Sequence, residues 1–123
     1  MEIALYPTPE QIQALLADPT PGPVVMVNLL RFKPGGEEAY ARYATPMREI
    51  VESRGGRFVW SGRVTSQVIG AGGEDVTIVA LVEYPSRKAF VEIATSPKVA
   101  EIGANRAEGL EGQWLLASTE SPL

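Results

Sequence analysis

Apolar residues recur with two different periods along the chain, and the changes of period mark the predicted elements. Apolar runs rich in β-branched residues predict strands over 24–32, 57–69, 76–84 and 113–118. Apolar residues at three- and four-residue spacing predict helices over 9–17, 37–54, 87–95 and 97–108. After the first helix the order is β-α-β-β-α-β. It predicts an α+β, ferredoxin-like fold, a four-stranded antiparallel sheet with helices on one face, preceded by an extra N-terminal helix.

Three hydroxyl–proline pairs mark places where helices are expected to begin. Thr8-Pro9, Thr45-Pro46 and Ser96-Pro97 each place a capping side chain before a proline suited to the first helical position. Thr8 also stands three residues before Gln11, which is the spacing of a capping box. Because Pro46 falls inside 37–54, we expect it to kink that helix or divide it in two.

A proline-rich stretch over 18–23 separates the first helix from the rest of the chain. It can form neither a helix nor a paired strand, since proline lacks the backbone N–H group. We therefore expect residues 1–22 to form an N-terminal helix with its proline-rich connector, and residues 23–119 to form the ferredoxin-like domain.

The central strands are apolar on both of their faces. In the first strand Val25, Val27 and Leu29 alternate with Val24, Met26 and Leu30, and the third strand shows a similar alternation. One layer of helices covers only one face, so a second cover is needed. A second copy of the chain is the simplest cover, because two-fold dimers are the commonest oligomers. We therefore expect a homodimer built sheet against sheet, a dimeric α+β barrel.

Composition excludes more functions than it suggests. The 123 residues have an ordinary globular composition, 45% of them hydrophobic, and a formal net charge of −4. That charge argues against nucleic acid or an anionic membrane as the main partner. The chain contains no cysteine and no histidine. Disulfides, zinc fingers, thiolate nucleophiles, histidine triads and histidine-ligated haem are thereby excluded.

The N-terminal residues do not resemble a secretory signal, because an acid stands at position 2 and no basic stretch precedes an apolar one. The longest apolar runs have the length of a strand and are far shorter than the ~20 residues of a spanning helix. We expect a cytoplasmic protein with no membrane partner.

Several short motifs resemble those of a known family. The run VMVNLLRF at 25–32 resembles its first strand, and GGRF at 55–58 resembles the start of its second. EYPS at 83–86, then Ser96-Pro97 and then Arg106, resemble its third strand and last helix. In order and spacing these motifs, over about 24–114, resemble domain-of-unknown-function family 1330 of the dimeric α+β-barrel superfamily.

The resemblance implies a homodimer whose two sheets form a barrel, and it implies little about chemistry. Related barrels include cofactor-independent oxygenases, isomerases, haem-handling proteins and proteins without known activity, and a shared fold is a weak guide among them. This chain also departs from the family pattern. Val99 stands where the family usually has a tyrosine, and the segment before Pro23 is an addition that could cover the sheet edge or a pocket.

Asn28 and Arg106 are the first candidates for a binding site. Asn28 is an amide in an apolar strand, where it either orients a ligand or is a structural amide bonded to a neighbouring loop. Arg106 lies late in the last predicted helix and offers a fork to a carboxylate or phosphate. Alternatively, Arg106 complements the helix dipole or pairs with Glu101 or Glu108.

Aromatic side chains supply further candidates. Trp60 and Tyr84 are interpreted as residues that line a pocket for a planar ligand. Tyr43 and Trp114 are interpreted as core residues. Arg57 and Arg63 are expected to share one face of the second strand, opposite Phe58 and Trp60, and to be solvated.

Acid–base chemistry has no obvious basis, because no pair of the 15 acidic residues stands out by its spacing. Glu83 is interpreted as one member of a salt bridge at a strand end, the alternative being a buried carboxylate with a raised pKa. The glycine-rich 70–73 is interpreted as a turn, since it lacks the lysine of a phosphate loop. No metal or other cofactor is predicted, although a carboxylate-only magnesium or calcium site stays open.

Three hypotheses of function follow. The first is an enzyme for a small organic molecule, a cofactor-independent oxygenase or isomerase without metal or haem. The second is a module that binds a metabolite without catalysis, and the third is a purely structural dimer. A pocket that contains both Asn28 and Arg106 would favour the first two hypotheses over the third.

Overall fold

The computed structural model, which describes residues 2–123, contains one antiparallel sheet. Its strands are β1 (Val24–Phe32), β2 (Arg57–Arg63), β3 (Ile78–Tyr84) and β4 (Leu110–Ser118). They lie in the order β2-β3-β1-β4, and every neighbouring pair is antiparallel. The ferredoxin-like α+β prediction is confirmed.

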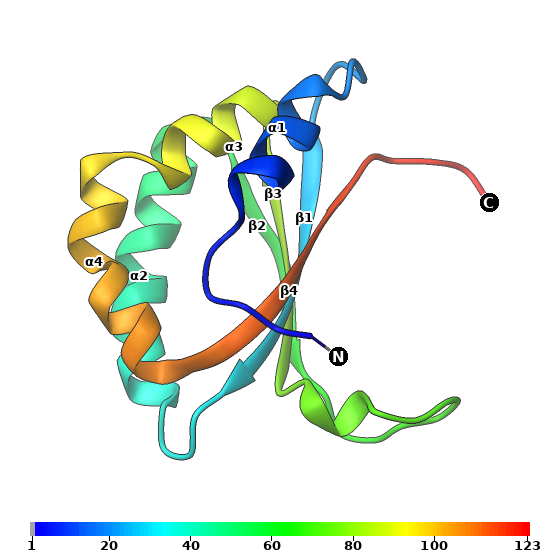
Figure 1. The fold of residues 1–123 in the computed structure, drawn as a ribbon, viewed down its shortest axis with the longest axis vertical. Helices are drawn as coiled ribbons and strands as arrows, with labels where there is room; N and C mark the ends of the chain where they lie inside the picture. The colour runs from blue at the N-terminus through cyan, green and yellow to red at the C-terminus, as the bar shows by residue number, and fades with distance from the viewer. Residues whose placement is uncertain (1) are drawn as a thin grey trace.

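Helices cover one face of this sheet (Figure 1). They are α1 (Pro9–Ala17), α2 (Glu37–Ser53), α3 (Arg87–Ala94) and α4 (Pro97–Gly109), with a short 3₁₀ turn η1 (Gly73–Asp75) before β3. The buried core lies between sheet and helices, where Met26 and Val82 pack against Met47, Val51 and Ile93. No helix within residues 2–123 is both long enough and apolar enough to cross a membrane.

The helix starts are confirmed at two of the three hydroxyl–proline pairs. Thr8 and Gln11 form the complete capping box, and Ser96 caps α4. The pair Thr45-Pro46 begins no helix, because α2 runs through Pro46 as one element. Tyr43 before the proline and Val51 after it pack on the same core, and this packing offsets the lost hydrogen bond.

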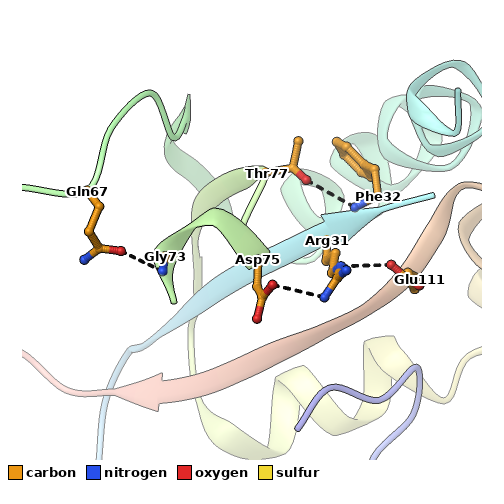
Figure 2. Close-up of polar contacts among 7 residues, drawn as sticks. All are labelled: Arg31, Phe32, Gln67, Gly73, Asp75, Thr77 and Glu111. Atoms are coloured by element: carbon orange, nitrogen blue, oxygen red, sulfur yellow. Dashed lines mark hydrogen bonds and ion pairs between the residues drawn. The ribbon is translucent and has the colours of Figure 1, made fainter. Parts of the chain in front are cut away.

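The second and third strands are shorter than predicted, and a loop over 64–77 connects them. Beyond Arg63 the chain leaves the sheet, and the side chain of Gln67 accepts a hydrogen bond from the Gly73 amide at 2.6 Å (Figure 2). Thr77 fixes the return of the loop, since its hydroxyl accepts from the Phe32 amide at 3.3 Å. Side-chain contacts within the loop thus replace the pairing that strand propensity predicted.

A β-bulge at Val59 shifts the faces of β2. Trp60 pairs with Leu81 and so lies on the face away from the helices, whereas Phe58 points toward the helices. The expectation that Arg57 and Arg63 share a face is therefore wrong. Arg57 lies on the face away from the helices and pairs with Glu83 at 3.0 Å, which confirms the salt bridge predicted for that carboxylate. Arg63 lies on the helix side and pairs with Glu37 of α2 at 2.9 Å.

The second face of the sheet is apolar, and among residues 2–123 the N-terminal segment (residues 2–7) reaches it at β4, where Ile3 lies beside Gly112 and Trp114 donates to the Glu2 carbonyl. We call it the outer face, and its apolar members are Val25, Val27, Leu29, Trp60, Val79, Leu81, Trp114 and Leu116. The side chain of Trp60 is 58% exposed and that of Leu116 is 49% exposed. Figure 1 shows the 64–77 loop and the C-terminal tail projecting on this side, where the N-terminal segment also ends. The two-faced alternation predicted for the central strands is confirmed.

Arg31 marks the end of the outer face near the 64–77 loop. Its guanidinium lies 3.2 Å from the Asp75 carboxylate and 2.9 Å from that of Glu111 (Figure 2). These contacts tie β1, the loop and the start of β4 together at one corner of the sheet.

One close backbone approach accounts for two glycines, and it gives the first testable prediction. Gly109 at the end of α4 meets Gly36 before α2, and a Cβ on either residue would collide with the backbone of the other. We expect Gly109→Ala to lower the free energy of unfolding by about 1–3 kcal/mol. Gly103→Ala is the matched control in the same helix, because open space surrounds that position. It should raise stability by about 0.5–1 kcal/mol. Urea unfolding measures both, and an equal effect of the two changes would contradict the close approach.

Candidate functional site

A chain of hydrogen bonds on the helix side of the sheet links the centre of β1 to the end of α4. Asn28 donates from Nδ2 to the carbonyl oxygens of Met26 and Ala80, at 3.3 and 3.2 Å. Its Oδ1 accepts from Nε2 of Gln113 on β4 at 3.2 Å. Gln113 Oε1 in turn accepts from Nη2 of Arg106 at 2.7 Å. The side-chain amides of Asn28 and Gln113 each use both their oxygen and their nitrogen in hydrogen bonds, which fixes their orientation. Through Gln113 the sheet also holds the guanidinium of Arg106.

The N-terminal segment, residues 2–7, crosses β4 beside this chain on its way to α1 (Figure 1). Ala4 and Gln113 exchange two backbone hydrogen bonds, of 3.3 and 3.0 Å. Trp114 donates from Nε1 to the carbonyl of Glu2 at 2.8 Å. The additional N-terminal piece therefore covers the edge of the sheet, which is one of the roles expected for it.

Arg106 joins α4 to this segment through neutral partners. Its Nη1 donates to the carbonyl of Leu5 at 2.6 Å, and its guanidinium carbon lies 5.6 Å from the centre of the Tyr6 ring. The expected pairing with Glu101 or Glu108 is not formed, since Glu108 pairs with Arg42 at 3.4 Å instead. The position in the last turn of α4 does suit the helix dipole.

Within residues 2–123, Arg106 is the one arginine with no carboxylate within 4.0 Å. The other seven each have such a partner: Arg31, Arg42, Arg48, Arg54, Arg57, Arg63 and Arg87. Arg106 is also half-buried. A cation removed from part of its water without a counter-charge is favourably placed to bind an anion.

A groove of about 700 Å³ opens between the N-terminal segment with α1 on one side and β4 on the other. We call it the N-terminal groove. Its polar lining includes Arg106 and Gln113. Its apolar lining includes Leu15 from α1, Met26 from β1 and Leu115 from β4. Polar groups and apolar walls therefore meet in one space.

A second guanidinium lines the groove, but it is already paired. Arg87 lies 3.5 Å from the Asp18 carboxylate and donates to the Thr20 carbonyl at 3.0 Å and the Thr119 hydroxyl at 3.1 Å. Hydrogen bonds from Thr20, with a smaller contribution from Arg87, hold the pKa of Asp18 below its usual value. Asp18 is thus a carboxylate near neutral pH and a weak base.

Three tyrosines, Tyr40, Tyr43 and Tyr84, lie in the interior between sheet and helices. Burial raises the pKa of each phenol above its ordinary value, and the charge of Arg106 only partly opposes this for Tyr40 and Tyr43. The phenols therefore stay protonated at neutral pH. They are able to donate hydrogen bonds and are not suited to act as bases.

The structure brings two of the four predicted site residues together and separates the other two from them. Asn28 and Arg106 are linked through Gln113, although only Arg106 lines the N-terminal groove. Trp60 lies on the outer face because of the bulge at Val59. Tyr84 is 5% exposed and packs edge-on against Phe90, at 5.0 Å between ring centres.

Sequence reasoning missed two residues of this site and misinterpreted a third. Gln113 and Tyr6 were not singled out. Gln113 shares the helix side of β4 with the apolar Leu115, and a polar residue on an otherwise apolar face is a signal that could have identified it. The interpretation of Trp114 as a core residue is wrong. Trp114 is 39% exposed, because its side chain lies on the outer face of an edge strand. Tyr43, by contrast, packs against the core as expected.

Within the described part of the chain, no three acidic side chains gather closely enough to hold a metal ion. The carboxylate-only metal site that the sequence left open therefore has no candidate position among residues 2–123. The expected cytoplasmic location and the lack of a nucleic-acid partner stay predictions.

Comparison with known proteins defines the family. The sequence pattern of the "Domain of unknown function (DUF1330)" family matches residues 29–119, and the chain belongs to that family, as the motifs predicted. Among curated proteins, none matches this chain.

Solved structures agree with the fold. RPA0582, a protein of unknown function from Rhodopseudomonas palustris, is 32% identical, with a TM-score of 0.86 over 98% of this chain and 100% of its own. A dabb family protein with a ferredoxin-like fold from Mesorhizobium loti has 15% identity and a TM-score of 0.59, over 82% of this chain and 99% of its own. SnoaB, a cofactor-independent oxygenase from Streptomyces nogalater, has 14% identity and a TM-score of 0.60, over 83% and 96%. The latter two are similar to this chain in fold alone.

The chain of amides gives the second prediction. We expect Gln113→Ala to lower the free energy of unfolding by about 1–3 kcal/mol, because it leaves Asn28 Oδ1 and an Arg106 N–H without partners. Combined with Asn28→Ala, it should show a coupling energy of about 0.5–3 kcal/mol in a double-mutant cycle. Gln13→Ala on the exposed side of α1 is the control and should stay within about 0.5 kcal/mol of the wild type. Strict additivity of the two changes would show that the hydrogen bond between Asn28 and Gln113 contributes nothing to stability.

Proposed function

We propose that this protein is a homodimer that binds a small organic molecule in the N-terminal groove. The observation that supports the proposal is the lining of the groove, in which Arg106 and Gln113 are close together beside apolar walls. Ligand pockets typically combine an apolar surface with a few polar groups that fix orientation, within about 300–1,000 Å³. The groove has both properties.

Binding is favoured over catalysis because the groove supplies donors and lacks a suitable base. The chain has no histidine and no cysteine, the nearby phenols have raised pKa values, and that of Asp18 is lowered. A general base works best with a pKa near the operating pH. Arg106 and Gln113, the donors that line the groove, are able to orient a ligand without accepting a proton from it.

Cofactor-independent oxygenation or isomerisation of the bound molecule is a second candidate, and one observation favours it. Arg106 has no counter-charge among the described residues and could stabilise the enolate or phenolate anion through which such reactions proceed. Reactivity would then come largely from the substrate. Oxygen uptake with a phenol whose anion reacts with O₂, lost in Arg106→Gln, would support this activity. Oxygen uptake equal to that of a protein-free control would contradict this activity and leave only the binding function.

We further infer that a second copy of the chain covers the outer face. A continuous apolar face is rarely left in water by a soluble domain, and closed two-fold pairing is its commonest cover. The 64–77 loop and the C-terminal tail project on the same side, so they flank the face (Figure 1). In that loop Val68 is 87% exposed and Ile69 is 89% exposed, so two further apolar side chains are available for contact with a second copy.

A change that fills the groove tests the binding function. Ala14 on α1 lines the groove, whereas Ala100 on α4 is exposed and lies outside it. We expect freshly purified wild-type protein to carry a bound molecule in native mass spectrometry, or to gain thermal stability from one member of a metabolite library. Ala14→Trp should lose that molecule because its ring occupies the space, and Ala100→Trp should keep it. A wild-type protein that binds nothing would support a purely structural dimer, and equal loss in both variants would place the ligand elsewhere.

A charged residue on the outer face tests the dimer. Trp60→Glu would place a carboxylate in an apolar interface, which is costly for a charge without a partner. We expect this variant to be monomeric in light scattering and native mass spectrometry, with an unchanged circular dichroism spectrum. Leu16→Glu on α1, where the side chain is 49% exposed, is the control and should stay dimeric. A monomeric wild type would contradict the proposed dimer.

A further inference from the structure

We propose that the N-terminal groove selects an organic monoanion, a carboxylic acid on a flat apolar body, whose carboxylate binds Arg106. The inference rests on the proposed binding function and adds the chemical class of the ligand. It excludes neutral molecules, phosphate esters and dicarboxylates as preferred ligands.

The free donors of Arg106 are the first support. A guanidinium has five N–H groups. Two of them are used here, one by the Leu5 carbonyl and one by Gln113 Oε1, which leaves three. Both partners are neutral, so the positive charge has no counter-charge within 4.0 Å among residues 2–123. A carboxylate matches the planar fork of the remaining donors and supplies the missing charge.

The other charges of the groove limit the ligand to one negative charge. The second guanidinium, Arg87, is already neutralised by Asp18 at 3.5 Å. Glu2 also lines the groove, and its exposed carboxylate would repel a second acid group near β4. With Arg87 and Asp18 paired, one guanidinium and one carboxylate remain, so the groove suits a monoanion better than a phosphate or a dianion, because like charges disfavour one another.

The aromatic side chains indicate the shape of the ligand. The Tyr6 ring lies against the guanidinium that would hold the acid group, at 5.6 Å. Trp114 also belongs to the lining of the groove, and its side chain lies on the outer side of β4, where Nε1–H donates to the Glu2 carbonyl. An aromatic ring beside an anion site favours a flat ligand, which stacks with little loss of conformational freedom.

Two probes of the same shape test the proposal. 2-Naphthoate and 2-naphthamide differ in charge and little in size, and calorimetry on the purified full-length protein measures both. We expect the wild type to bind naphthoate about tenfold more tightly than naphthamide, since charge-assisted hydrogen bonds to Arg106 are lost in the amide. 2,6-Naphthalenedicarboxylate should bind more weakly than naphthoate.

Variants assign the preference to Arg106. Arg106→Gln should bind the two naphthyl probes equally, whereas Arg106→Lys should keep a reduced preference for the acid. Arg42→Gln, which removes an arginine paired with Glu38 and Glu108 outside the groove, should behave as the wild type. Circular dichroism verifies that each variant is folded.

The outcomes separate the ligand class from the binding function. Equal affinities of the wild type for acid and amide would overturn the monoanion proposal and leave groove binding intact. A preference for the acid that persists in Arg106→Gln would also overturn it. If the wild type binds none of the probes, the monoanion proposal fails. The proposal of groove binding fails as well if, in addition, the purified wild-type protein carries no molecule and gains no thermal stability from any member of the metabolite library.

Discussion

The arrangement of the site depends on the hydrogen bonds that the guanidinium of Arg106 donates. It joins the end of α4 to β4 through Gln113 and to the N-terminal segment through the Leu5 carbonyl. Gln113 in turn donates a hydrogen bond to Asn28 at the centre of β1, so the sheet holds the charged group of Arg106 in place. Every one of these partners is neutral, so the bonds orient the cation without cancelling its charge.

The second constraint is the sheet with two apolar faces. One face packs on α2, α3 and α4 and forms the core, and the other is left as the outer face. A ferredoxin-like protomer has helices on only one side. The groove and the outer face meet at β4, where Trp114 and Leu116 belong to both, but Arg106 and Gln113 lie on the helix side and Trp60 lies on β2 at the opposite edge. A proposed dimer and a proposed ligand can thus be tested separately.

Sequence patterns predicted the order of the elements and the two-faced strands because both depend on local periodicity. They failed where tertiary contacts decide. The bulge at Val59 moved Trp60 to the other face, and nothing in the alternation of β2 indicates an extra residue there. Pro46 was expected to kink its helix or divide it in two, and it does not divide the helix, because core packing holds both halves. Asn28 and Arg106 were singled out for their residue types, but Gln113, which connects them, becomes significant only once β4 is placed beside β1.

NMR of the arginine side chains during titration with 2-naphthoate examines the role of Arg106 most directly, because each guanidinium reports its own Nε–H group. The structure predicts that the Arg106 signal shifts as the carboxylate binds, while the seven arginines that already have carboxylate partners stay in place. An unchanged Arg106 signal at saturation, or an equal shift at Arg87, would contradict the assignment of the anion site to Arg106.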